Sequence, residues 1–199
     1  IYIEHDDVDW MEVSSMKDFI DNAKATEDER MHYFVLATNC VIDDDLDKYV
    51  MTNDAICLNG YNLIFNKGYG ITLLSGRVEK FTIADCGAVN KVYGSIMSKE
   101  GDSEGGLEYH FFVRNGELRI YNAGIEGFTI DANDENTKLM DIRKDAKVVF
   151  ENVKFKNNVY NNADNTVSLM KINNAADVTF NKVIFENNKV YNSGDEDLV

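Results

Sequence analysis

The C-terminal third of the chain contains one sequence unit written twice. Ten residues recur at a fixed spacing of thirty positions. The first copy has Leu139, Met140, Ile142, Ala146, Val148, Phe150, Val153, Phe155, Asn157 and Asn158, and the second has Leu169, Met170, Ile172, Ala176, Val178, Phe180, Val183, Phe185, Asn187 and Asn188. Self-similarity at a period of about 20–50 residues is typical of solenoids and propellers. The repeat therefore constrains the fold more than any single motif does.

Apolar residues alternate with polar ones inside each copy, as they do in half-buried strands. The pattern predicts two short strands, Lys147–Phe150 and Val153–Phe155, that meet at Glu151-Asn152. Asn at this corner fits, because it tolerates the left-handed backbone conformation of a tight turn. The Asn-rich segment after each second strand reads as a loop that returns the chain to the next level.

One such unit cannot bury its own apolar face, so the copies must stack on one another. We therefore predict a single all-β domain over 1–199, a parallel β-helix whose coils span 33–192. Leucine-rich repeats fit less well, because no helical return segment is present, and propeller blades need four strands per repeat. We expect Phe150, Phe155, Phe180 and Phe185 to point inward.

The repeat extends upstream with small changes in length. Val113, Leu118 and Ile120 precede Ile142, Val148 and Phe150 by 29, 30 and 30 positions. Ile56–Phe65 reads as a strand, an Asn-Gly corner and a second strand, and Lys80–Gly87 reads as a further strand segment after a Ser75-Gly76 corner. Between these themes, Gly94–Gly106 reads as an irregular insertion. A loop projecting from a rigid array is a common location for function.

A helix is expected at the N-terminal end, over Ser14–Ala25. The hydroxyl of Ser14 or Ser15 is expected to cap it by accepting backbone N–H groups. Met16, Phe19, Ile20 and Ala23 fall on one face. We interpret this helix as a cap over the apolar end of the first coil, with a partner-binding helix as the alternative.

Charge and composition exclude several partners. The net charge of −15 argues against nucleic acid and anionic membranes, which require a basic surface. No apolar run is long enough to insert into a bilayer. The chain opens mid-pattern at Ile1-Tyr2-Ile3, and the acidic segment Ser193–Val199 looks too short to cover the last coil. We therefore expect the natural polypeptide to continue, with this chain as the N-terminal segment of a longer surface stalk.

Acidic clusters and cysteines predict no metal or cofactor. Asp43, Asp45 and Asp47, with Asp54 at the twelfth position, have calcium-loop spacing, but Lys48 replaces the required Gly. We read this segment, like Asp131–Asn136, as a solvated loop. Three cysteines without CxxC spacing do not suggest a zinc site or a disulfide framework. Cys57 and Cys86, 29 residues apart, are expected at equivalent inward positions as buried thiols, with a disulfide as the alternative.

The order of these segments resembles a known family. Capping helix, Ile-Cys-Leu-Asn-Gly-Tyr-Asn-Leu, Phe-Thr-Ile-Ala-Asp-Cys-Gly and Phe-x-x-Asn units resemble the right-handed parallel β-helix regions of secreted or wall-attached bacterial and archaeal adhesin-like proteins. Phe155–Asn158 and Phe185–Asn188 resemble the Phe-x-x-Asn repeats of polymorphic outer-membrane proteins, although their Gly-Gly-Ala motif is missing. The resemblance covers roughly 14–192 and implies a right-handed coil. The same scaffold also carries pectate lyases and polygalacturonases.

Candidate catalytic residues are few. Chemistry on acidic polysaccharides would need paired carboxylates, or calcium-ligating Asp with an Arg or Lys base. The candidates by position are Asp85, Asp131, Asp141, Arg114, Arg119 and Arg143, of which Arg114 and Arg143 are 29 apart and expected to stack in successive coils. The Trp-x-Asp-His and Asn-Thr-Asp patterns of pectin-degrading relatives are missing. His5, His32 and His110 are scattered, and Trp10 is the single tryptophan.

We assign no catalytic residue from the sequence. The preferred interpretation is a non-catalytic extracellular module, at the cell surface or secreted, that acts as stalk and binding scaffold. We expect host or environmental glycans or surface proteins as partners. The alternative is a carbohydrate-active enzyme, a polysaccharide lyase or glycoside hydrolase with a pectate-lyase-like fold.

Overall fold

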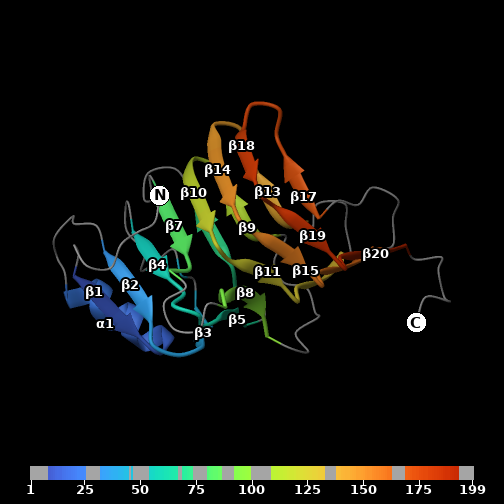
Figure 1. The fold of residues 1–199 in the computed structure, drawn as a ribbon. Coiled ribbons are helices and arrows are strands. Elements are labelled where there is room, and N and C mark those ends of the chain that lie inside the picture. The colour runs from blue at the N-terminus through green and yellow to red at the C-terminus, as the bar shows by residue number, and fades with distance from the viewer. Residues whose placement is uncertain are drawn as a thin grey trace.

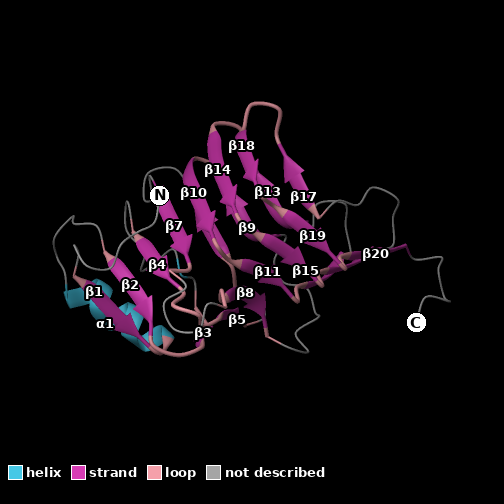
Figure 2. Ribbon diagram, in the orientation of Figure 1, coloured by secondary structure: helices cyan, strands magenta, loops and turns pink. Residues whose placement is uncertain are grey.

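The computed structural model describes residues 9–25, 32–44, 46, 54–66, 69–73, 80–86, 92–99, 109–132, 138–162 and 169–192. In these ranges the chain forms parallel strands gathered into four sheets, together with one helix (Figures 1 and 2). The prediction of an all-β fold with parallel strands is therefore confirmed. No helix in the described part of the chain combines the length and apolarity needed to cross a membrane.

Sheet A is the longest and keeps its strands in chain order. It contains β1 (Trp10–Val13), β2 (Tyr33–Leu36), β4 (Ala55–Cys57), β7 (Lys80–Ala84), β10 (Gly116–Tyr121), β14 (Ala146–Glu151) and β18 (Asp177–Asn181). Figure 1 shows these strands passing from blue to red across the molecule. We use "rung" for the chain from one strand of sheet A to the next.

The other three sheets keep the same order. Sheet B contains β3 (Cys40–Ile42), β5 (Leu63–Phe65), β8 (Ser95–Ser98), β11 (Gly124–Glu126), β15 (Lys154–Lys156) and β19 (Ile184–Glu186). Sheet C contains β6 (Ile71–Leu73), β9 (Tyr109–Val113), β13 (Lys138–Ile142) and β17 (Met170–Ile172). Sheet D contains β12 (Thr129–Ala132), β16 (Val159–Asn162) and β20 (Lys189–Asn192). The chain therefore visits the sheets in turn.

The strand register follows the sequence repeat where the repeat is clearest. Phe150 pairs with Phe180, thirty residues later, and Ile120 pairs with Phe150 at the same spacing. Earlier rungs differ in length. Ile83 pairs with Ile56 on one side, 27 residues earlier, and with Ile120 on the other, 37 residues later. The N-terminal rungs thus share the register without sharing the period.

The apolar side chains that alternate along the strands form one continuous core. Phe150 and Phe155 are fully buried, and their rings meet edge to face at 5.3 Å. Phe180 and Phe185 continue the same columns, but they are 44% and 56% exposed because β18 and β19 are the last strands of their sheets. Phe180 and Phe185 stack on Phe150 and Phe155, in keeping with the expected inward direction, but the second copy is not fully buried. The segment Ser193–Val199 lies outside the described residues.

Asn residues form the corners, as the sequence predicts. Asn122, Asn152 and Asn157 have φ of 51°, 53° and 54°, the left-handed region in which Asn is the best tolerated residue after Gly. Their side chains also bond along the stack. Asn152 Nδ2 donates to Asn122 Oδ1 at 2.9 Å, and in the neighbouring column Asn158 Nδ2 donates to Asn188 Oδ1 at 2.9 Å. Corner residues therefore stabilise both the turn and the register.

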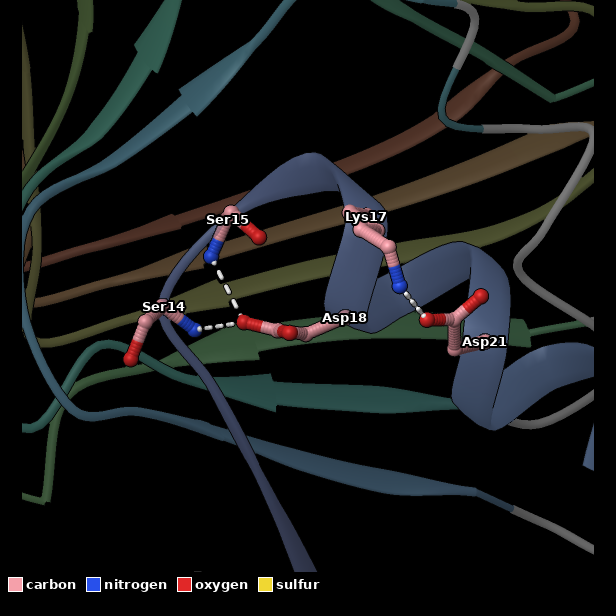
Figure 3. A network of polar contacts seen from close by, with 5 residues as sticks. All are labelled: Ser14, Ser15, Lys17, Asp18 and Asp21. Carbon is pink, nitrogen blue, oxygen red and sulfur yellow. Dashed lines mark hydrogen bonds and ion pairs between the residues drawn. The ribbon is translucent and has the colours of Figure 1, made fainter.

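The helix α1 (Met16–Ala25) packs against β1 and β3, at the N-terminal end of sheets A and B. Phe19 is buried, and its ring lies 5.0 Å from that of Phe34. The N-terminal cap differs from the expected serine hydroxyl. The Asp18 carboxylate accepts the N–H groups of Ser14 (2.7 Å) and Ser15 (2.9 Å), as Figure 3 shows. One turn further on, the ammonium of Lys17 pairs with Asp21 (Figure 3).

The structure corrects two other segment assignments. The expected insertion Gly94–Gly106 contains a regular strand, β8, which pairs with β5 and β11 in sheet B. The mixed small and polar residues of this segment did not indicate a strand in the sequence, although β8 lies between two other strands. In the proposed acidic loop, Asp54 is fully buried and accepts the backbone N–H of His32 at 2.8 Å, while Asp45, Asp47 and Lys48 lie outside the described residues.

Candidate functional site

Three successive rungs turn from sheet C into sheet A through polar corners. The residues that directly follow β9, β13 and β17 are Arg114, Arg143 and Asn173, and the strand register makes them equivalent. The N–H of Arg143 donates to the carbonyl of Val113 at 2.8 Å, and that of Asn173 donates to Ile142 at 2.8 Å. The backbone ladder thus continues into the corner and fixes where these side chains begin.

A surface cavity of about 550 Å³ lies over these corners. We call it the corner pocket; it is lined by Phe112, Arg114, Asn115, Arg143, Lys144, Asp145 and Asn173. Three of these side chains are cationic and one is anionic, whereas the whole chain carries a net charge of −15. Clustered charge of one sign in a concave surface raises the local concentration of oppositely charged ligands. The corner pocket therefore favours an anionic group.

Arg143 is the best-positioned cation of the corner pocket. Its Nη2 lies 2.9 Å from Asp141 Oδ2, and its Cζ lies 5.7 Å from the centre of the Phe112 ring. The Arg143 side chain remains 40% exposed, whereas that of Asp141 is almost fully buried. A buried carboxylate and an aromatic face on two sides restrict the rotamers of the guanidinium. Its remaining surface can meet a ligand without a large loss of side-chain entropy.

The arginines of the corner pocket offer the chemistry of anion binding. A guanidinium keeps its proton throughout the accessible pH range, and it matches the geometry of a carboxylate or sulfate through two parallel N–H···O bonds. Asn115 and Asn173 add amide groups that suit hydroxyl-rich ligands. Among the lining residues, Asp145 provides the single carboxylate, so the pocket does not present a carboxylate pair on its surface.

The structure brings together three of the six candidates identified in the sequence. Arg114 and Arg143 occupy equivalent positions in neighbouring rungs, as expected, and Asp141 is the ion-pair partner of Arg143. Arg119 lies apart, on β10, where its side chain contacts Glu117 at 2.7 Å. The corner pocket region therefore brings together fewer of the candidate residues than the sequence suggested.

Glu117 forms a small network of charges on sheet A. Its Oε1 also lies 3.3 Å from Lys147 Nζ, on the neighbouring strand. Burial opposes ionisation, but the hydrogen bond and charge of Arg119 and those of Lys147 outweigh it and lower the pKa of Glu117. Arg119 is therefore engaged in an ion pair within β10, and Lys147 links the same carboxylate to β14.

Asp85 has a structural role. Its carboxylate is buried, and Oδ2 accepts the N–H groups of Gly60 (2.9 Å) and Gly94 (2.5 Å). Asn122 Nδ2 also donates to its carbonyl at 3.3 Å. Asp85 therefore joins corners of three rungs, which explains a buried acid in an apolar stack.

The remaining candidates lie away from the corner pocket or outside the described side chains. Asp131 belongs to β12, but its side chain lies outside what the structure describes, and so does His5. His32 is buried, with Nδ1 3.2 Å from Asp54 Oδ1. His110 has Nδ1 3.4 Å from the carbonyl of Tyr69, and burial lowers its pKa below the ordinary value.

Sequence reasoning missed several residues of the corner pocket, namely Phe112, Asn115, Lys144, Asp145 and Asn173. One signal was available. Asn173 stands thirty positions after Arg143, so extending the repeat from the strands into the corners would have aligned it with the arginine column. Phe112 carried no comparable signal, because an aromatic residue in a strand usually belongs to the core.

Comparison with models of known protein families, with curated proteins and with solved structures finds no match. Among the described residues, no three His, Cys, Asp or Glu side chains gather in a way that could hold a metal ion.

Proposed function

We propose that this chain is a non-catalytic module of an extracellular, cell-surface or secreted adhesin-like protein. In this proposal a right-handed parallel β-helix acts as stalk and scaffold, and the corner pocket binds an anionic group of a glycan or surface protein. The observation that carries the proposal is Arg143, held between Asp141 and Phe112 at a corner that three rungs build together.

The way in which successive rungs pack on one another supports the scaffold role. Chain-ordered parallel sheets with a common register allow each rung to pack on the previous one, so length grows without a new fold. An array of this type places its corners at regular intervals along a rigid body. That arrangement suits a protein that must hold a binding surface away from the point where it is attached.

The ligand part rests on charge and shape. A cationic pocket within a strongly acidic protein selects a local anionic group, because the rest of the surface repels extended polyanions. Short acidic oligosaccharides with carboxylate or sulfate groups meet both conditions, and the asparagine amides can accept or donate to sugar hydroxyls. We therefore expect binding of acidic oligosaccharides in preference to neutral ones of equal length.

Binding should be measured by calorimetry at about 0.15 M salt, where charges more than about 8 Å apart are largely screened. The probes are short oligogalacturonates, sulfated oligosaccharides and neutral glucan oligosaccharides. Arg143→Gln should weaken binding of the acidic probes at least about tenfold, as expected when a charge-assisted hydrogen bond is lost. Equal binding of neutral and acidic probes would contradict the proposal.

Two further variants separate a binding defect from a folding defect. Arg114→Gln changes an exposed lining residue that pairs with no buried side chain in the described part of the chain, so it should weaken binding without affecting stability. Arg119→Gln is the matched control, because it removes an arginine from the Glu117 network outside the corner pocket. Loss of binding in the Arg119 variant as large as in the Arg143 variant would argue for general charge rather than a site.

The alternative proposal, a carbohydrate-active enzyme, has one observation in its favour. Asp141 is buried beside Arg143, and its Oδ1 accepts no hydrogen bond from the described residues. Buried acids beside cations occur in active sites as well as in structural ion pairs. Cleavage of uronate polysaccharides, with or without calcium, that is lost in Asp141→Asn would establish this alternative and overturn the non-catalytic proposal.

A further inference from the structure

The last described rung leaves apolar side chains exposed at the end of the stack. Its strands β17, β18, β19 and β20 each lie at one end of their sheet, and no other described strand pairs with their outer side. Between 44% and 56% of the side chain is exposed at four positions, Ile172, Phe180, Phe185 and Val190. Their register partners one rung earlier are all fully buried. We call this surface, the outer side of β17–β20 with these four side chains, the end face.

Charged residues on sheet A alternate in sign from rung to rung. Glu117 has Lys80 on one side and Lys147 on the other. Lys147 pairs in turn with Asp177, on the edge strand β18. The register corresponds to a real contact in this column, because Lys147 Nζ lies 3.3 Å from Glu117 Oε1. The column therefore runs basic, acidic, basic, acidic, and it ends on an acid at the end face.

A second column on sheet B repeats this alternation. Glu126 pairs with Lys156, and Lys156 pairs with Glu186 on the edge strand β19. Each member stands nine residues after its counterpart on sheet A, so the two columns carry the same sign in every rung. In sheet C, Asp141 pairs with Lys171. Among the described strands, every register pair of two charged residues joins opposite signs.

The alternation specifies what can be added at the end face. Opposite charges on facing residues stabilise neighbouring strands, and like charges destabilise them. Asp177, Glu186 and Lys171 are exposed, and each already has an opposite charge on the side toward the stack. A further strand is therefore favoured when it brings a base opposite each of the two acids and an acid opposite the lysine. The end face thus selects for charge as well as for apolar side chains.

We propose that the end face binds a segment of a partner polypeptide, which adds one further parallel rung to the stack. The segment carries two basic residues nine positions apart, opposite Asp177 and Glu186, and apolar residues opposite Phe180 and Phe185. Main-chain hydrogen bonds to the edge strands supply affinity, and the facing side chains supply selectivity. A second copy stacked head to tail is not this partner, because α1 packs against β1 and β3, the strands at which such a copy would join. The inference does not depend on the ligand proposed for the corner pocket.

The chain itself supplies two matched probes. The peptide 139–162 presents the favourable signs, one acid and two bases, at Asp141, Lys147 and Lys156. The peptide 169–192, thirty residues later, presents the opposite signs at the same three positions. The two peptides share the apolar repeat and have similar net charge, with five basic and three acidic residues in the first and three basic and two acidic in the second. They therefore differ mainly in the signs that the end face would meet.

Each labelled peptide should be titrated with the full chain at about 0.15 M salt, with fluorescence anisotropy as the measurement. We expect the peptide 139–162 to bind at least about tenfold more tightly, because three facing pairs change from like to opposite sign. Amide hydrogen exchange of the chain should slow in β18 and β19 when this peptide binds. Equal binding of the two peptides, binding of neither, or protection elsewhere in the chain would overturn the proposal.

Charge variants make the result specific. Asp177→Lys combined with Glu186→Lys should reverse the preference between the peptides, and Asp177→Asn combined with Glu186→Gln should remove most of it. Both side chains are exposed, so neither pair of substitutions should unfold the chain. Asp9→Lys combined with Glu12→Lys is the matched control, because it changes the net charge equally at the opposite end of sheet A. A reversal in this control as well would attribute the preference to general charge and overturn the proposal.

Sedimentation of the chain without peptide tests the other possible occupant. We expect a monomer, because the end face of a second copy does not present the alternating rung that continues the stack. A concentration-dependent dimer would assign the end face to a second copy, and the proposed partner would then be wrong.

Discussion

Phe155 and Phe185 stack almost face to face in successive rungs, with ring centroids 4.9 Å apart and planes only 9° from parallel. Phe155 is completely buried, whereas Phe185 is 56% exposed. The sequence repeat makes these residues identical, and their position in the stack makes them energetically different. Stability therefore depends on the rung in which a residue lies as well as on its place in the repeat.

The first prediction compares these two rings. Phe155→Ala should lower the free energy of unfolding by about 3–5 kcal/mol, because it leaves a cavity in the core. Phe185→Ala should cost about 1 kcal/mol, mainly the lost stacking, and Lys154→Ala, an exposed control, about 0.5 kcal/mol or less. Urea denaturation provides the measurement. Similar losses for both phenylalanines would show that the end of the stack is covered in solution.

The second prediction concerns a buried asparagine. Asn158 Oδ1 accepts the N–H of Phe128 at 3.1 Å, and its Nδ2 donates to the carbonyl of Ile125 at 2.9 Å. Asn158→Ala removes both hydrogen bonds to these backbone groups in a buried site and should cost about 2–4 kcal/mol. Asn188→Ala, at the equivalent but more exposed position, should cost about half as much. The ordering would fail if the two variants had equal unfolding midpoints.

The third prediction concerns pH and the helix cap. Hydrogen bonds from the backbone of Ser14, and then from Ser15, lower the pKa of Asp18 below its ordinary value. The carboxylate therefore stabilises the fold above about pH 4, and this contribution is lost as the pH falls through the lowered pKa. Because Asp18 is only partly buried and its charge is screened by solvent, Asp18→Asn should cost only about 0.5 kcal/mol at pH 7.

The stability difference between wild type and Asp18→Asn should shrink to nothing at low pH, where both side chains are neutral. Fluorescence of Trp10 is a suitable probe, since it is the single tryptophan and lies on β1, against which α1 packs. A difference that stays constant down to pH 2 would show that the Asp18 carboxylate does not supply the cap.

The fourth prediction separates two reasons for glycine. A Cβ on Gly94 would overlap the carbonyl oxygen of Tyr61, whereas a Cβ on Gly127 meets nothing within 4 Å, although its φ is +72°. Gly94→Ala should therefore cost about 3 kcal/mol or more, because backbone must move. Gly127→Ala should cost about 1–2 kcal/mol for the left-handed backbone alone. Thermal unfolding of both variants tests this order.

The C-terminal rungs were predictable because their period is constant. Identical spacing carries strand, corner and inward face from one copy to the next, and β14 and β15 agree with the expected strands within one or two residues. Burial was less predictable, because a repeat describes a residue's direction and not whether another rung lies over it. Phe180 and Phe185 illustrate this difference.

The N-terminal rungs were harder to predict for a related reason. Stacking fixes the register of the strands, but the corners between them tolerate insertions. The spacing of Cys57 and Cys86 therefore suggested equivalent positions, whereas the register pairs Cys57 with a residue two positions before Cys86. Because the corners vary in length, the repeat spacing gave no signal for β8 either. Of the candidate site, the Arg114 and Arg143 column followed from spacing, whereas the Phe112 and Asp141 contacts needed three-dimensional packing.

The uniform register of the C-terminal rungs also has a mechanical consequence. Tension applied along the stack would detach terminal rungs one at a time, and each would release the same length of chain. A rung of thirty residues, as from Phe150 to Phe180, corresponds to about 100 Å of extended chain. The N-terminal rungs, with offsets of 22, 27 and 37 residues, would lengthen in unequal steps. Under tension, the C-terminal rungs would thus release equal lengths of chain and the N-terminal rungs unequal lengths.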